Sequence, residues 1–157
     1  MYKVKRFIRK IIRIFEYLPI LWKTADHDYG YNIELFKYQL QRTAAYMQLH
    51  GHTEDAQLNA TKITAAVGLI DRGYLGKYID EAEISFERQY GQPDITFDET
   101  DGMYNMRMYW PTAADSDHND QINEFYQAQM TAAYNKADNA KGQLWKYISE
   151  NIETWWD

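Results

Sequence analysis

Three carboxylates on one predicted helix are the first residues that could do chemistry. Asp80, Glu83 and Glu87 follow one another at steps of three and four, which places them on one face of a helix. Carboxylate oxygens suit Mg²⁺, and all-helical nucleotide pyrophosphatases hold that ion with acidic pairs on two facing helices. The clearest second acidic group of this chain falls in a predicted hairpin instead. A solvated helix face is therefore the simpler interpretation, and Mg²⁺-dependent nucleotide hydrolysis stays a second alternative function.

Three predicted loops hold Asp and His side chains that could bind a metal ion, at 26–28, 50–52 and 115–120. None of them has two histidines at helical i, i+4 spacing or another signature of known ligand geometry. Polar loops collect Asp and Asn because these side chains stabilise turns. We therefore expect no metal site and no cofactor.

The familiar motifs of nucleophilic catalysis and phosphate binding are missing from the sequence. The chain has no Cys, which excludes thiol chemistry, disulfides and Cys-bound metals. It has no G-x-S-x-G motif and no glycine-rich phosphate loop. The absence of these motifs predicts a protein that is not an enzyme and has no catalytic residues.

Aromatic residues are the unusual part of the composition, with 14 Tyr, 6 Phe and 5 Trp among 157 residues. Arg107 and Tyr109 lie on one predicted strand with Tyr104, and a guanidinium with aromatic rings could hold the phosphate and base of a small nucleotide. A strand that packs on helices explains the same residues. Trp110 and Trp156 are candidates for a partner interface, although core packing accounts for a Trp equally well.

Residues 1–18 give the clearest periodic signal, that of a basic amphipathic helix. At about 100° per residue the apolar side chains fall on one face and the basic ones on the other. The basic candidates for a partner interface are Lys3, Arg6, Arg9, Lys10 and Arg13. Because Pro19 disfavours helical geometry at the residue before it, we expect the helix to end near Tyr17. The apolar face could lie on the protein's own core, on a neighbouring subunit or on an anionic membrane surface.

The remaining residues, 19–157, are expected to form a single helical domain. Apolar stripes at steps of three and four predict helices at about 32–49, 54–71 and 75–90. A period of two around Gly102 then predicts a β-hairpin at about 94–110. From about residue 120 the helical period returns, as one helix or two collinear ones, with Trp155 in the core. The predicted fold class is all-α, a helical bundle with a small β-hairpin inserted before a long C-terminal helix.

The charge is divided unevenly along the chain. Residues 1–24 carry seven basic side chains and one acidic one, or +6, in a chain of net charge −6, so the other residues carry −12. An acidic body argues against nucleic-acid binding by the main domain. A basic segment that meets the acidic body of a neighbouring copy would also produce a homo-oligomer, which we expect.

Several short pieces carry a resemblance when they are taken together. They are 17–22 (Tyr-Leu-Pro-Ile-Leu-Trp), Asp26-x-Asp28-Tyr29, 34–40 (Glu-Leu-Phe-Lys-Tyr-Gln-Leu), Phe86-Glu87-x-x-Tyr90-Gly91 and Trp155-Trp156-Asp157. The set resembles a family of small uncharacterised proteins encoded by tailed bacteriophages. The resemblance brings no assigned activity, so it transfers no catalytic or binding residue. It implies the cytoplasm of an infected bacterial cell.

Small phage proteins of this kind often act on the host or form part of the virion. The expected function is therefore that of a non-enzymatic accessory binding protein, for example a counter-defence factor that sequesters a nucleotide signal or binds a host protein. The alternative is a structural subunit of a virion or of a larger oligomeric assembly. Both hypotheses rest on the resemblance together with the aromatic content, the hairpin and the uneven charge.

Overall fold

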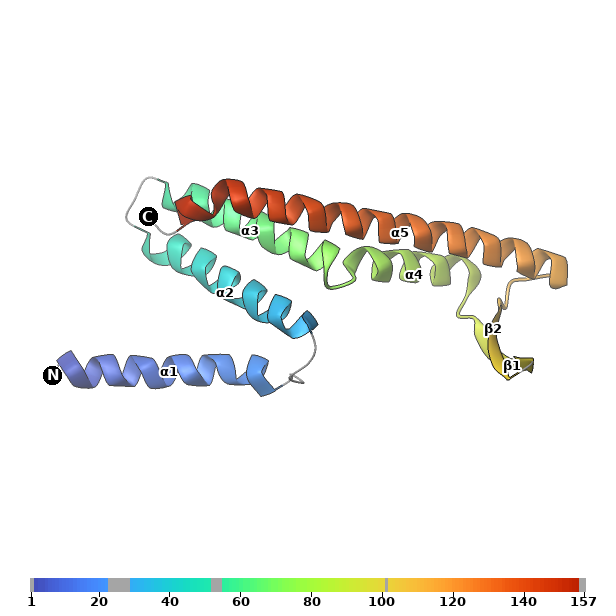
Figure 1. Ribbon diagram of the computed structural model, residues 1–157, viewed down its shortest axis with the longest axis horizontal. Coiled ribbons are helices and arrows are strands. Elements are labelled where there is room, and N and C mark those ends of the chain that lie inside the picture. The colour runs from blue at the N-terminus through green and yellow to red at the C-terminus, as the bar shows by residue number, and fades with distance from the viewer. Residues whose placement is uncertain (1, 23–28, 52–54, 101, 156–157) are drawn as a thin grey trace. The chain divides into compact units, whose positions relative to one another are not determined.

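Figure 1 shows the computed structural model of the chain, which describes residues 2–22, 29–51, 55–100 and 102–155, with the backbone alone at 2, 3, 9, 29 and 100. The elements in order are α1 (Tyr2–Trp22), α2 (Tyr29–His50), α3 (Ala56–Gly73), α4 (Lys77–Tyr90), β1 (Asp94–Thr100), β2 (Met103–Tyr109), α5 (Ser116–Asn151) and the short 3-10 helix η1 (Ile152–Trp155). The predicted fold class, all-α with a small hairpin before a long C-terminal helix, is confirmed.

The chain divides into two compact units. Unit 1 comprises Met1–Val67 and Asn151–Asp157, and unit 2 comprises Gly68–Glu150. Both α3 and α5 pass from one unit into the other. A domain boundary after residue 18 stays a prediction.

The core of unit 1 is built on the apolar stripe of α3. Ala56, Ala60, Ile63 and Val67 are buried as the helical period predicts. Trp155 is completely buried, so its expected place in the core is confirmed. The buried amide of Asn59 donates a hydrogen bond of 2.8 Å to the carbonyl of Thr154 and so ties α3 to η1. Trp156 lies outside the described residues.

Helix α1 is longer than the sequence predicts. It continues through Pro19 to Trp22, so the expected end near Tyr17 is wrong. Proline removes one backbone hydrogen bond, but only three helical residues follow it here, so the loss falls near the end of the helix. One turn before Pro19, the carbonyl of Glu16 accepts a hydrogen bond of 2.8 Å from the hydroxyl of Tyr38 in α2. This contact ties α1 to α2 beside the proline.

Unit 2 is organised by α5, which is one continuous helix of 36 residues. Its expected stripe is buried at Ile122, Met130, Ala133, Ala137, Ala140, Leu144 and Ile148. Helix α4 runs alongside the first half of α5, and the hairpin projects from the end that the two helices share (Figure 1). The helix begins four residues earlier than the expected Asp120, because Asp115 caps it by accepting a hydrogen bond of 2.9 Å from the backbone N–H of His118.

The hairpin pairs β1 and β2 in antiparallel register, with Ile95 opposite Met108 and Phe97 opposite Met106. The strands extend through Thr100 and from Met103, so the loop is shorter than the sequence predicts. Gly102 has φ +74, a conformation that glycine adopts without steric cost. The described sheet has these two strands alone.

Candidate functional site

The acidic and histidine-containing segments do not form a metal site among the residues that the structure describes. No group of three or more His, Asp or Glu side chains there could hold a metal ion. Residues 26–28 and His52 lie outside the residues that the structure describes. At 115–120, Asp115 caps α5, and Nδ1 of His118 accepts a hydrogen bond of 3.1 Å from the backbone N–H of Ala114. The polar side chains of that loop therefore serve the start of a helix.

The carboxylates of α4 are exposed at Asp80, Glu83 and Glu87. Two of them act on a neighbouring ring in α5: burial first, and then the negative charges of Glu83 and Glu87, raise the pKa of Tyr126. An exposed acidic face next to a half-buried tyrosine needs no bound ion. The magnesium-dependent alternative therefore gains no support from this arrangement.

The hairpin presents two chemically different faces, because successive residues of a strand point to opposite sides. Residues opposite each other in the register share a face. The apolar face consists of Ile95, Phe97, Tyr104, Met106 and Met108, and one exposed carboxylate, that of Glu99, shares it opposite Tyr104 near the turn. The polar face consists of Asp94, Thr96, Asp98, Met103, Asn105, Arg107 and Tyr109. The expected nucleotide-binding residues are thus separated, since Tyr104 lies on the other face from Arg107 and Tyr109.

Arg107 is engaged within the hairpin. Its Nε lies 2.8 Å from Oδ2 of Asp98 on the neighbouring strand. The adjacent Tyr109 hydroxyl, and then the charge of Asp98, raise the pKa of Arg107. A phosphate would have to share this guanidinium with a carboxylate, which repels it.

The apolar face of the hairpin stands in solvent. Ile95, Phe97, Tyr104 and Met106 are 48–71% exposed. Soluble proteins seldom leave clustered large apolar side chains uncovered without a binding role. The face is therefore a candidate binding surface.

The base of the hairpin is held firmly on α5. Trp110 is only 4% exposed and packs against Phe86 and Tyr126, with ring centroids 5.0 and 5.4 Å apart. Its indole N–H donates to Oδ1 of Asn123 at 2.8 Å, and its backbone N–H donates to Oδ1 of Asn119 at 2.9 Å. Both asparagine amides in turn donate to the carbonyl of Met108, at 2.9 and 3.1 Å. Trp110 is thus a core residue that anchors the hairpin, which corrects its expected place at a partner interface.

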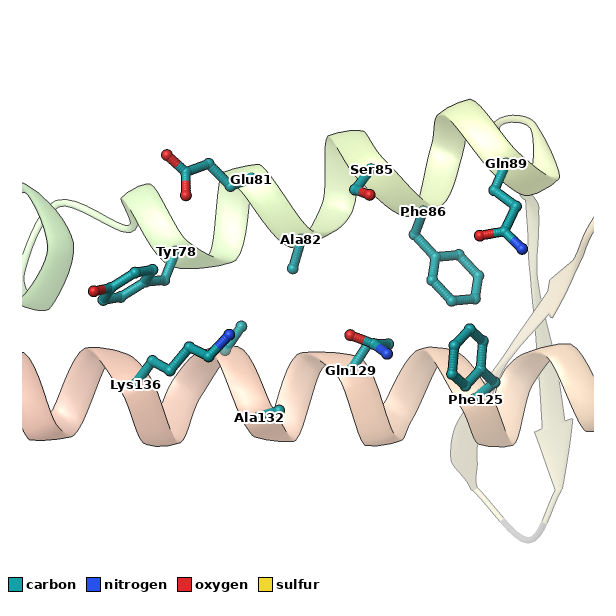
Figure 2. Close-up of a pocket in the computed structure, with 11 residues that line it drawn as sticks. Tyr78, Glu81, Ala82, Ser85, Phe86, Gln89, Phe125, Gln129, Ala132 and Lys136 are labelled. Atoms are coloured by element: carbon teal, nitrogen blue, oxygen red, sulfur yellow. The ribbon is translucent and has the colours of Figure 1, made fainter.

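A groove that the sequence did not predict lies between α4 and α5, with a volume of about 330 Å³ (Figure 2). Tyr78 and Lys136 lie at one end, and Phe86 and Phe125 at the other. The wall between them is formed by Glu81, Ala82, Ser85, Gln129, Ala132 and Ala133, and Gln89 lies beyond Phe86 at the second end. Because Ala82, Ser85, Ala132 and Ala133 are small, their side chains do not fill the space between the two helices. The small residues Ala82 and Ser85 of α4 and the alanines of α5 are the only signal in the sequence, and they become informative once the two helices are known to be neighbours.

Helix α1 carries the predicted basic residues, and its apolar face is open. The side chains of Arg6, Lys10 and Arg13 are exposed, whereas those of Lys3 and Arg9 lie outside the description. None of the described helices combines the length and the apolar content that a bilayer crossing requires. The contacts of α1 with α2 are made near its C-terminal end, where the Tyr17 and Tyr38 rings meet edge to face at 5.3 Å.

Comparison of the chain with protein-family models, with curated proteins and with solved structures finds no match.

Proposed function

We propose that this protein is a non-enzymatic binding protein and that the apolar face of the hairpin meets its partner. The observation that carries the proposal is the exposure of Phe97, Tyr104 and Met106 on a sheet of two described strands. A two-stranded hairpin is marginally stable in water by itself. Here the anchor at Trp110 supports it from one end and leaves the apolar face uncovered. A firm base with an open apolar face is suited to binding.

The chemistry of this face favours a protein as the partner. Phe, Tyr and Met are enriched in protein–protein interfaces, and methionine adapts its shape to varied partners. A nucleotide would need a cation that is available for phosphate, and Arg107 already pairs with Asp98. The resemblance to small tailed-phage proteins adds a setting for this proposal, in which the partner is a host protein of the infected bacterium.

The proposal is tested by co-purification from bacterial cells with matched variants of the two hairpin faces. Phe97→Ser with Met106→Ser removes two large side chains from the apolar face, and Met103→Ser with Asn105→Ser alters the polar face at comparable exposed positions. We expect the first pair to weaken partner binding about 30-fold or more, since an interface hot spot contributes about 2 kcal/mol. The second pair should leave partner recovery unchanged.

Both pairs should keep the free energy of unfolding within about 1 kcal/mol of the parent value, because all four side chains are exposed. Equal recovery of the partner by both pairs would contradict the proposal. Native mass spectrometry of the purified chain gives a further check: a small molecule bound at the hairpin, in place of a protein, would favour nucleotide sequestration instead.

A further inference from the structure

We infer that α1 binds the surface of an anionic membrane, lying in the plane of the bilayer with its apolar face in the lipid. Ten large apolar side chains between Val4 and Trp22 are 37–85% exposed. They fall on one side of a helix of 21 residues, which is about 30 Å long. Exposed apolar residues on an ordinary protein surface are scattered, whereas these form one continuous stripe along the whole helix.

The attachment of α1 to α2 leaves this stripe uncovered. It uses residues outside the stripe, Glu16 and Tyr17, which lie at about 100° and 200° from Phe15. Oε2 of Glu16 lies 2.5 Å from the guanidinium of Arg42, and the Tyr17 hydroxyl donates to the side chain of Gln39. Arg42 also stacks over the ring of Tyr17, 5.2 Å from its centroid. The contacts with α2 therefore turn the polar side of α1 toward the protein and the apolar side away from it.

The charge of α1 selects an anionic surface. Lys5, Arg6, Lys10 and Arg13 are exposed, and the only acidic residue of the helix, Glu16, is paired with Arg42. Lipid headgroups with negative charge attract each such cation near the surface. A helix with a basic face and a Phe- and Ile-rich face is the form that lies in the membrane interface. Trp22 is 85% exposed at the end of α1, and tryptophan prefers this boundary.

A membrane surface fits both faces of α1 better than a second copy of the chain does. Residues 25–157 carry −12 and would attract the basic face of a neighbour. That contact leaves the apolar face in water, because the two faces point in opposite directions. At a bilayer surface the apolar side chains enter the acyl region while the long basic side chains reach the headgroups.

The test is flotation of the full-length protein with vesicles. We expect co-flotation with vesicles of phosphatidylglycerol and phosphatidylcholine at low salt, much weaker co-flotation with phosphatidylcholine alone, and loss of binding as salt screens the charges. Lys10→Glu with Arg13→Glu should weaken binding about 30-fold or more, and Phe7→Ser with Ile11→Ser should abolish it. Lys10→Arg with Arg13→Lys keeps the charge and should retain binding.

Phe97→Ser with Met106→Ser is the matched control, because it alters exposed apolar residues outside α1. It should float as the parent protein does, so the result is independent of the proposed function of the hairpin. Absence of co-flotation at low salt, or equal binding to both kinds of vesicle, would overturn the inference. The parent protein could instead form oligomers that Phe7→Ser with Ile11→Ser abolishes, and fail to bind vesicles. That result would assign the apolar face to a second copy of the chain and would also overturn the inference.

Discussion

Replacing Trp110 with Ala is expected to lower the free energy of unfolding by about 3–5 kcal/mol. The ring fills the centre of an aromatic cluster with Phe86 and Tyr126, and its two N–H groups are bonded to asparagine side chains of α5. The substitution leaves a cavity where several rings met. It also leaves the amide oxygen of Asn123 without the indole donor. Urea unfolding followed by circular dichroism measures the loss.

Trp145→Ala is the matched control in the same unit. Trp145 is about half exposed, and its indole N–H donates to the Tyr74 hydroxyl at 2.6 Å. We expect a loss of about 1–1.5 kcal/mol from that hydrogen bond and the partial burial. Similar losses for the two tryptophans would show that Trp110 is not the centre of the core in unit 2. Trp110→Ala should in addition weaken partner binding, since the hairpin loses its anchor.

Gly91→Ala is expected to cost about 2–4 kcal/mol. Gly91 ends α4 with φ +83 and ψ 173, a conformation that is essentially restricted to glycine. An added Cβ would also lie 2.5 Å from Cγ of Pro111, where the chain leaves the hairpin. The same junction is closed by the Thr112 hydroxyl, which donates to the carbonyl of Tyr90 at 3.0 Å. The strain therefore falls on the segment that positions the base of the hairpin.

Gly142→Ala provides the control for this substitution. Gly142 lies inside α5, and among the described residues no atom other than its chain neighbours and the backbone of its own helix comes within 4 Å of an added Cβ. Alanine there should stabilise the protein by about 0.5–1 kcal/mol, because it reduces the entropy of the unfolded chain and favours the helix. A cost for Gly91→Ala no larger than the effect of Gly142→Ala would mean that the junction of α4 and the hairpin is not constrained.

Helical periodicity was sufficient to predict most of the fold. The stripes of α3 and α5 were identified because apolar residues at steps of three and four have one consistent face, as at Ile63 and Leu144. The ends of helices were less predictable. Asp115 is equally compatible with a metal-binding loop and with a helix cap, and only its hydrogen bond to the N–H of His118 distinguishes them. Pro19 likewise signals the end of a helix, yet α1 continues to Trp22.

The candidate site was predicted only in part. A period of two locates the hairpin, but it places Trp110 and Phe97 on the same face, so it could not tell that Trp110 is buried while Phe97 is exposed. That difference arises from Asn119 and Asn123, which lie nine and thirteen residues beyond Trp110 and reach it only because α5 passes the base of the hairpin. The groove between α4 and α5 likewise depends on which helices are neighbours. Such contacts between distant residues carry no local signal.

Methionine oxidation measures directly whether the apolar face of the hairpin is open in the free protein and covered in the complex. Met106 lies on the apolar face, Met103 lies on the polar face, and Met130 is buried in α5. Peroxide treatment followed by peptide mass spectrometry gives the oxidation rate of each residue. In the free protein we expect Met103 and Met106 to react much faster than Met130. In the complex with the co-purified partner, the rate of Met106 should fall toward that of Met130 while Met103 stays reactive. Slow oxidation of Met106 in the free protein, or equal protection of Met103 and Met106 in the complex, would contradict binding through this face.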